Sequence, residues 1–160
     1  MRLFEITQPS SVDLTSAINR VIDEWLEHRR CNAPSDINTG KASGCCDDFV
    51  SDVYEQFGGV REAESRGISD VSIASFMNED GRFDLPLLRS HWKAVKPTQG
   101  LNWKHMNRLA YEANFDDATH VWLTYGGRHY DAECPTGVVN FFDLPFFVRV
   151  ISAWKQHKGL

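Results

Sequence analysis

The amino-acid sequence predicts an α+β fold in which residues 1–160 form a single domain. Three observations support this class: apolar residues recur at helical spacing in the first half of the chain, a β-hairpin pattern comes after residue 120, and no repeat or linker divides the sequence. A length of 160 residues is usual for one domain with one core. With 42% apolar and 24% charged residues, the composition is close to globular averages and argues against a disordered chain.

The first half of the chain is predicted to be mostly helical. After a short edge strand within residues 3–6, apolar spacing predicts one helix over 11–30 and a second over 46–57, which ends at a glycine pair. The polar segment 31–44 contains proline and glycine but no periodicity, so it is predicted to be a loop. A charged stretch, 61–66, follows the second helix without a predicted element of its own.

The second half is predicted to combine short helices with a β-hairpin. Helices are expected at 71–77, 85–95 and 102–113, strands at 121–125 and 128–132, and either a strand or a helix at 146–154. The two strands flank Gly126-Gly127, a pair typical of a two-residue hairpin turn. This turn sets a register in which Tyr125 pairs with Arg128, and so on outward along both strands.

Cys46 is the candidate nucleophile. At about 100° per residue, it shares the apolar stripe of its helix with Phe49, Val50 and Val53, so its thiol is expected to point inward. A thiol in the first helical turn lies among unpaired N–H groups at the positive end of the helix dipole, which favours the thiolate. Acidic residues in the same turn oppose this effect, so an added base is required. On the helix alone, a buried structural cysteine is the more frequent interpretation.

The hairpin supplies that base and its partner. In the predicted register, His120 lies diagonal to Asp131 and directly opposite Glu133, on one face with Trp122. Either carboxylate could accept from the imidazole and select its tautomer, and Asp131 is favoured because Glu133 would have to fold back. A solvated polar pair is the commoner role for such residues, but a large tryptophan between them suggests the wall of a covered cleft.

Three segments, taken in order, carry a resemblance to a known superfamily. They resemble the signature segments of transglutaminase-like proteins within the papain-like superfamily: Gly44-Cys45-Cys46-Asp47-Asp48-Phe49-Val50, His120-Val121-Trp122 and Tyr130-Asp131-Ala132. The resemblance implies a papain-like fold in which the helix of the catalytic cysteine packs on a small antiparallel sheet, with additional helices. It also implies that Cys46 is the nucleophile, His120 the general base and acid, and Asp131 the residue that orients the imidazole.

The chemistry implied is thiol-dependent hydrolysis or acyl transfer at an amide or isopeptide bond of a peptide or protein, without a cofactor or metal ion. Cys46, Phe49, Val50, His120 and Val121 also resemble the pattern of NlpC/P60-like peptidases, so a cell-wall peptide hydrolase is a second possibility. A third is a papain-like binding module without activity, which the acidic residues beside the thiol keep open. No glutamine lies just upstream of the cysteine, so the second oxyanion donor stays unassigned.

Charge and targeting patterns bear on partners and location. The formal net charge of −5 lacks the basic excess that nucleic-acid binding requires. No run of about 20 apolar residues is present to span a membrane, and Met1–Glu5 begins no signal peptide. The four cysteines, at 31, 45, 46 and 134, are too few for a disulfide scaffold. These features predict a cytoplasmic protein with neither nucleic-acid nor membrane partners.

Overall fold

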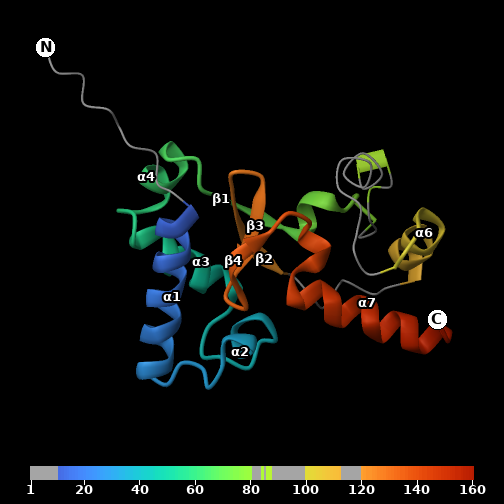
Figure 1. Ribbon diagram of the computed structural model, residues 1–160, viewed down its shortest axis with the longest axis horizontal. Coiled ribbons are helices and arrows are strands. Elements are labelled where there is room, and N and C mark those ends of the chain that lie inside the picture. The colour runs from blue at the N-terminus through green and yellow to red at the C-terminus, as the bar shows by residue number, and fades with distance from the viewer. Residues whose placement is uncertain (1–10, 81–83, 85, 88–99, 113–119) are drawn as a thin grey trace, which may run out of the picture.

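The computed structural model of the protein describes residues 11–80, 84, 86–87, 100–112 and 120–160. It has an α+β architecture, in which one four-stranded antiparallel sheet lies between two groups of helices (Figure 1). The predicted edge strand within 3–6 lies outside the described residues, as does all of the predicted helix 85–95 except 86–87. In the described part of the chain, no helix combines the length and apolar character needed to cross a membrane.

The longer helices agree with the apolar spacing that predicted them. The helical elements are α1 (Ser11–Glu27), α2 (Pro34–Asn38), α3 (Cys46–Glu55), α4 (Val60–Ser65), α6 (Trp103–Glu112) and α7 (Pro145–Lys158), with 3₁₀ turns η1 (Ile73–Phe76) and η2 (Phe141–Asp143). Helices α1, α3 and α6 fall where they were predicted. The ambiguous segment 146–154 is helical, within α7. Proline begins α7 and Gly159, with φ of 68°, ends it, as is typical of helix boundaries.

Two short helices were not predicted, because neither carries an apolar stripe. The segment 31–44 contains α2, which is specified by local capping: Pro34 occupies the first turn, and the Asp36 carboxylate accepts from the backbone N–H groups of Asn32 and Ala33. The charged stretch 61–66 lies almost wholly in α4, in which Ala63 is the buried residue. One buried side chain gives no helical periodicity to detect.

The sheet has the strand order β1-β2-β3-β4, with β1 at Ser69–Ser72, β2 at Val121–Tyr125, β3 at Arg128–Asp131 and β4 at Cys134–Val138. The predicted hairpin is present, since Tyr125 pairs with Arg128 across Gly126-Gly127, both of which have positive φ. The predicted helix 71–77 is wrong at its start. Its first residues belong to β1, where Val71 pairs with Trp122 of β2.

The register prediction fails beyond Asp131. Strand β3 ends there, and Asp131 pairs with Cys134 of β4 across a two-residue turn formed by Ala132 and Glu133. Glu133 therefore lies in a turn and not opposite His120. Strand β4 itself was not predicted, because Pro135 and Gly137 give its sequence the appearance of a loop.

The sheet separates two hydrophobic clusters. Alternate residues of β2 serve opposite faces: Val121 and Leu123 pack with the buried sides of α1 and α3, whereas Trp122 packs with η2 and α7. Figure 1 shows the same division, with α1 and α3 on one side of the sheet and α7 on the other. The ends of β2 and β3 that carry His120 and Asp131 are therefore enclosed from both sides.

Gly137 in β4 is the glycine that packing restricts most clearly. A Cβ at this position would lie 2.5 Å from Cε1 of the buried Tyr130 ring, and the φ of Gly137 is 75°. We expect Gly137→Ala to lower the free energy of unfolding by about 3 kcal/mol, through overpacking added to backbone strain. Urea denaturation of the purified variant measures this change.

Gly127 is a matched control for that substitution. Its φ of 74° is nearly the same, but a Cβ there would meet no atom within 4 Å. Gly127→Ala should therefore cost only the backbone term, about 1 kcal/mol. Equal losses of stability in the two variants would contradict the crowding against Tyr130.

Candidate active site

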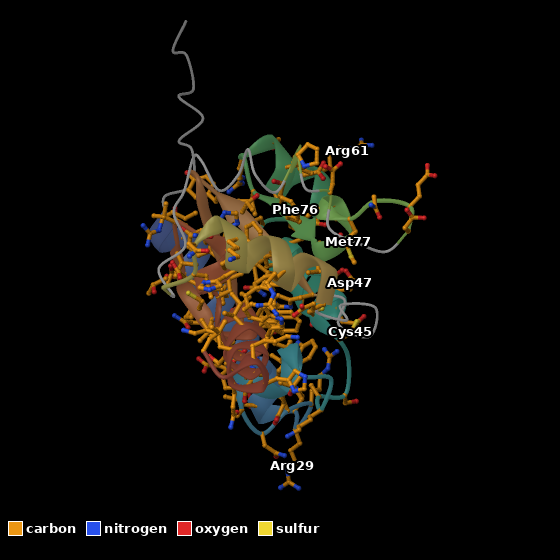
Figure 2. The ribbon with its side chains drawn as sticks, turned by 90° about the vertical axis from the view of Figure 1, so that its right-hand side faces the viewer. Arg29, Cys45, Asp47, Arg61, Phe76 and Met77 are labelled. Atoms are coloured by element: carbon orange, nitrogen blue, oxygen red, sulfur yellow. The ribbon has the colours of Figure 1, made fainter. Side chains whose placement is uncertain are left out.

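Cys46 is the first residue of α3, and the start of this helix is well defined. Cys45 is the N-cap residue, and its backbone N–H donates to the Asp48 carboxylate at 2.9 Å. Asp48 thus closes the helix start, while Asp47 and Cys45 lie at the outer edge of the molecule (Figure 2). The inward direction predicted for Cys46 is correct, because this residue is 9% exposed and belongs to the buried cluster beneath α1 and α3.

The environment of the Cys46 thiol favours its neutral form. Burial raises its pKa above the ordinary value for cysteine, and the negative charge of Asp47 acts in the same direction. A hydrogen bond from the backbone N–H of Val121 acts in the opposite direction but is outweighed. The expectation that the helix start favours a thiolate is therefore wrong for the resting protein. Desolvation outweighs the backbone hydrogen bonds that favour the thiolate, and deprotonation requires a base.

His120 and Asp131 form a buried pair. The imidazole Nε2 lies 2.9 Å from Asp131 Oδ2, and the two side chains are 0% and 2% exposed. A carboxylate only accepts, so in the neutral tautomer that fits this contact Nε2 carries the proton and Nδ1 has the lone pair. Nδ1 is buried and has no hydrogen-bond partner among the described residues. A basic nitrogen held in this way is what a general base needs.

Asp131 is itself fixed by the turn that follows it. Its second oxygen, Oδ1, accepts from the backbone N–H of Glu133 at 2.9 Å. The two carboxylate oxygens therefore have separate donors, which sets the plane of the carboxylate relative to the imidazole of His120. Of the two carboxylates weighed from the sequence, Asp131 contacts the imidazole, whereas the Glu133 side chain binds Arg149 and Asn38.

Aromatic side chains enclose the imidazole of His120. The Phe146 ring stacks on it with centroids 4.5 Å apart and planes inclined by 20°, and Trp122 stacks at 5.7 Å and 25°. Trp122 is fully buried, and its indole N–H donates to His129 Nδ1 at 2.9 Å. The prediction of a cleft wall at Trp122 is therefore wrong, because this side chain belongs to the core. The stacked rings cover the faces of the imidazole and limit its rotation.

The three predicted residues come from elements that pack together. Helix α3 contacts β2, and the sulfur of Cys46 receives its hydrogen bond from Val121, the residue that follows His120. Asp131 ends the neighbouring strand, β3. The fold thus brings Cys46 to Val121, 75 positions away in the sequence, but His120 Nδ1 has no hydrogen-bond partner among the described residues, so no hydrogen bond joins the imidazole to the thiol in this structure.

Three further residues around the site were not predicted from the sequence. Phe146 and Arg149 lie on α7 and Asn38 lies on α2, and each reaches the site only through tertiary packing. A local sequence pattern carries no signal for such contacts. Among the described residues, no group of three or more histidine, cysteine, aspartate or glutamate side chains is arranged to hold a metal ion.

A surface pocket of about 460 Å³ lies next to this site, on the side of the β3–β4 turn. Its lining includes Glu133, Ala132 and Pro145, and Cys46 is not part of it. No protein-family model, curated protein or solved structure matches the chain.

Proposed function

We propose that the protein is a papain-like cysteine hydrolase or acyltransferase that acts on amide or isopeptide bonds. The observation that carries this proposal is the buried His120–Asp131 pair. It leaves the imidazole Nδ1 without a hydrogen-bond partner among the described residues. His120 directly precedes β2, the strand whose first residue, Val121, contacts Cys46. Nucleophile, base and orienting carboxylate are the three groups that thiol-dependent acyl transfer uses.

The proposed reaction proceeds through a thioester on Cys46. The sulfur attacks the carbonyl carbon of the substrate while its proton passes to His120 Nδ1. The tetrahedral intermediate collapses, the bond to nitrogen breaks, and the imidazolium returns the proton to the leaving amine. Water, or a second amine in a transfer reaction, then attacks the thioester with His120 again acting as base. This step releases the product and restores the thiol.

The same helix that positions the nucleophile would stabilise the oxyanion. Backbone N–H groups in the first turn of an α-helix have no partner within the helix and point along its axis. In α3 this turn begins at Cys46, so such donors lie next to the attacking sulfur. Negative charge that develops on the carbonyl oxygen would be stabilised by them and by the helix dipole.

A binding module without catalytic activity is the second candidate function. Two observations favour it: His120 is completely buried, and burial raises the pKa of Cys46, so the resting thiol is protonated. In this alternative, the His120–Asp131 pair serves only to hold β2 and β3 together beneath α7. The two functions differ in whether the thiol of Cys46 can be activated in the folded protein.

Alkylation of the native protein distinguishes the two candidates. Cys31 and Cys46 are both buried, and burial raises the pKa of each thiol. They differ in that Cys46 accepts a hydrogen bond from Val121, the residue next to His120. At neutral pH and a low iodoacetamide concentration, we expect Cys46 to be alkylated at least about tenfold faster than Cys31, because a buried base can remove its proton. Mass spectrometry of peptides from the labelled protein measures both rates.

The exposed Cys45 provides a reference for reagent access in the same experiment. Asp131→Asn should slow alkylation of Cys46 while leaving that of Cys45 unchanged, since Cys45 contacts Asp48 and not the imidazole. Alkylation of Cys46 only after denaturation, together with Cys31, would overturn the hydrolase and favour the binding module.

A further inference from the structure

An ion pair between the β3–β4 turn and α7 lies directly behind the candidate site. Arg149 of α7 donates to Glu133 through two nitrogens, Nη1 to Oε1 at 2.7 Å and Nη2 to Oε2 at 2.8 Å. Asn38 of α2 adds a third hydrogen bond, from Nδ2 to Oε2 at 2.8 Å. One carboxylate thus connects three separate elements with the parallel geometry of a strong bidentate pair.

Glu133 acts on the imidazole through Asp131. Its backbone N–H is the donor to Asp131 Oδ1, and Asp131 Oδ2 accepts from His120. Because Glu133 lies in a two-residue turn, its side-chain contacts and this N–H belong to the same short segment. The position of the Asp131 carboxylate is therefore coupled to the contacts of the Glu133 side chain.

Arg149 acts on the imidazole through Phe146. The two residues are three positions apart in α7, so they lie on adjacent turns of one helix face. Phe146 stacks on His120 at 4.5 Å, while Arg149 binds Glu133. The ion pair consequently fixes the turn of α7 that covers the imidazole.

The charge state of Glu133 suits this role. Burial alone would raise its pKa, but the hydrogen bonds from Arg149 and Asn38 outweigh burial, and the net pKa lies below the ordinary value for glutamate. Its side chain is 12% exposed, against 43% for that of Arg149, so the pair is partly withdrawn from water. Removal of Arg149 leaves the mostly buried Glu133 carboxylate without its cation, and removal of either partner frees both attached elements.

We propose that Glu133 and Arg149 form a positioning pair, which holds the Asp131 carboxylate and the Phe146 ring on the imidazole of His120 at the same time. Neither residue touches the reacting atoms. This inference deepens the proposed function and rests on it for its catalytic consequence. The structural part, the fixed orientation of the imidazole, holds for any function of the site.

The test compares Glu133→Gln and Arg149→Met with the wild-type chain by two measurements. The first is the proton NMR resonance of His120 Nε2–H, which is expected downfield because this proton is hydrogen-bonded to a carboxylate and protected from solvent. We expect this resonance to broaden or disappear in both variants. The second is turnover of p-nitrophenyl acetate, for which we expect kcat to fall roughly fivefold with little change in KM. Arg149→Lys, which keeps the charge, should recover part of each loss.

Glu112→Gln is the matched control. Glu112 of α6 also binds α7, through Lys158 at 2.8 Å and Trp154 at 3.0 Å, but at the far end of that helix. This variant should change neither the resonance nor kcat. A retained resonance in both Glu133→Gln and Arg149→Met, or its loss in Glu112→Gln as well, would overturn the positioning pair.

The two readouts separate failure of this inference from failure of the proposed function. If the wild-type protein does not turn over p-nitrophenyl acetate but the resonance is lost only in the Glu133 and Arg149 variants, the hydrolase fails and the positioning pair stands. If turnover is present and neither variant changes the resonance or kcat, the hydrolase stands and the positioning pair fails.

Discussion

Cys46→Ala is expected to abolish acyl transfer from p-nitrophenyl acetate, with a loss of about 10³-fold or more in rate. The thiol is the only protein group in the proposed mechanism that bonds to the acyl carbon. Release of p-nitrophenolate reports the rate, and intact-protein mass spectrometry reports the acetyl group on the enzyme. The substitution removes one sulfur from a residue at the edge of the core, so folding should be retained.

Cys45→Ala is the control for this experiment. Cys45 is adjacent in sequence and exposed, and its thiol lies 3.5 Å from Asp48 Oδ2. We expect near wild-type turnover and an unchanged site of acetylation at Cys46. Acetylation that persists in Cys46→Ala and disappears in Cys45→Ala would contradict the assignment of the nucleophile.

Asp131→Asn is expected to lower kcat for p-nitrophenyl acetate by about 10²-fold. An asparagine that turns its amide N–H toward Nε2 stabilises the tautomer with the proton on Nδ1, so the nitrogen needed as a base becomes a donor. It also removes the negative charge that stabilises the imidazolium during the reaction. Steady-state kinetics measure the loss, and circular dichroism gives the folded fraction by which the rate is corrected.

Asp70→Asn is a matched control on the same sheet. Asp70 lies in β1, on a different strand from His120 and Asp131, and accepts a hydrogen bond from the hydroxyl of Tyr54. Asp70→Asn removes the same negative charge as Asp131→Asn and alters the hydrogen bond with Tyr54, so its effect on kcat should be small. Equal losses in both variants would show that the effect of Asp131→Asn is a general loss of structure and not a loss of tautomer control.

The parts of this fold that were predictable are those with local signals. Helix α3 shows a regular apolar stripe, and the β2–β3 hairpin combines alternation with a glycine pair in its turn. These two features were enough to predict that His120 contacts Asp131. The turn at Ala132 and Glu133 was not predictable, because it contains none of the residues that usually mark turns.

The electrostatics of the site were less accessible to sequence reasoning than its residues. The dipole of α3 is visible in the sequence, but the burial that raises the pKa of Cys46 depends on β2, which lies more than seventy positions away. The stacking of Phe146 on His120 and the hydrogen bonds from Arg149 to Glu133 likewise depend on α7, which is distant from α3 in the sequence. Residue type identifies the side chains that could take part in catalysis, whereas their burial and their pKa values depend on the assembled fold.

The strand order has a consequence for how the site assembles during folding. Strands β2, β3 and β4 follow one another through two-residue turns, whereas Ser72 of β1 and its partner Val121 are about fifty positions apart. Closing a loop of that length costs about 3 kcal/mol of chain entropy before any contact compensates it, so local pairing is expected to precede it. His120 and Asp131 are then joined early, within the three-stranded meander. Cys46 reaches β2 only when α3 docks, so under the proposed function the thiol stays apart from the imidazole until the fold is complete.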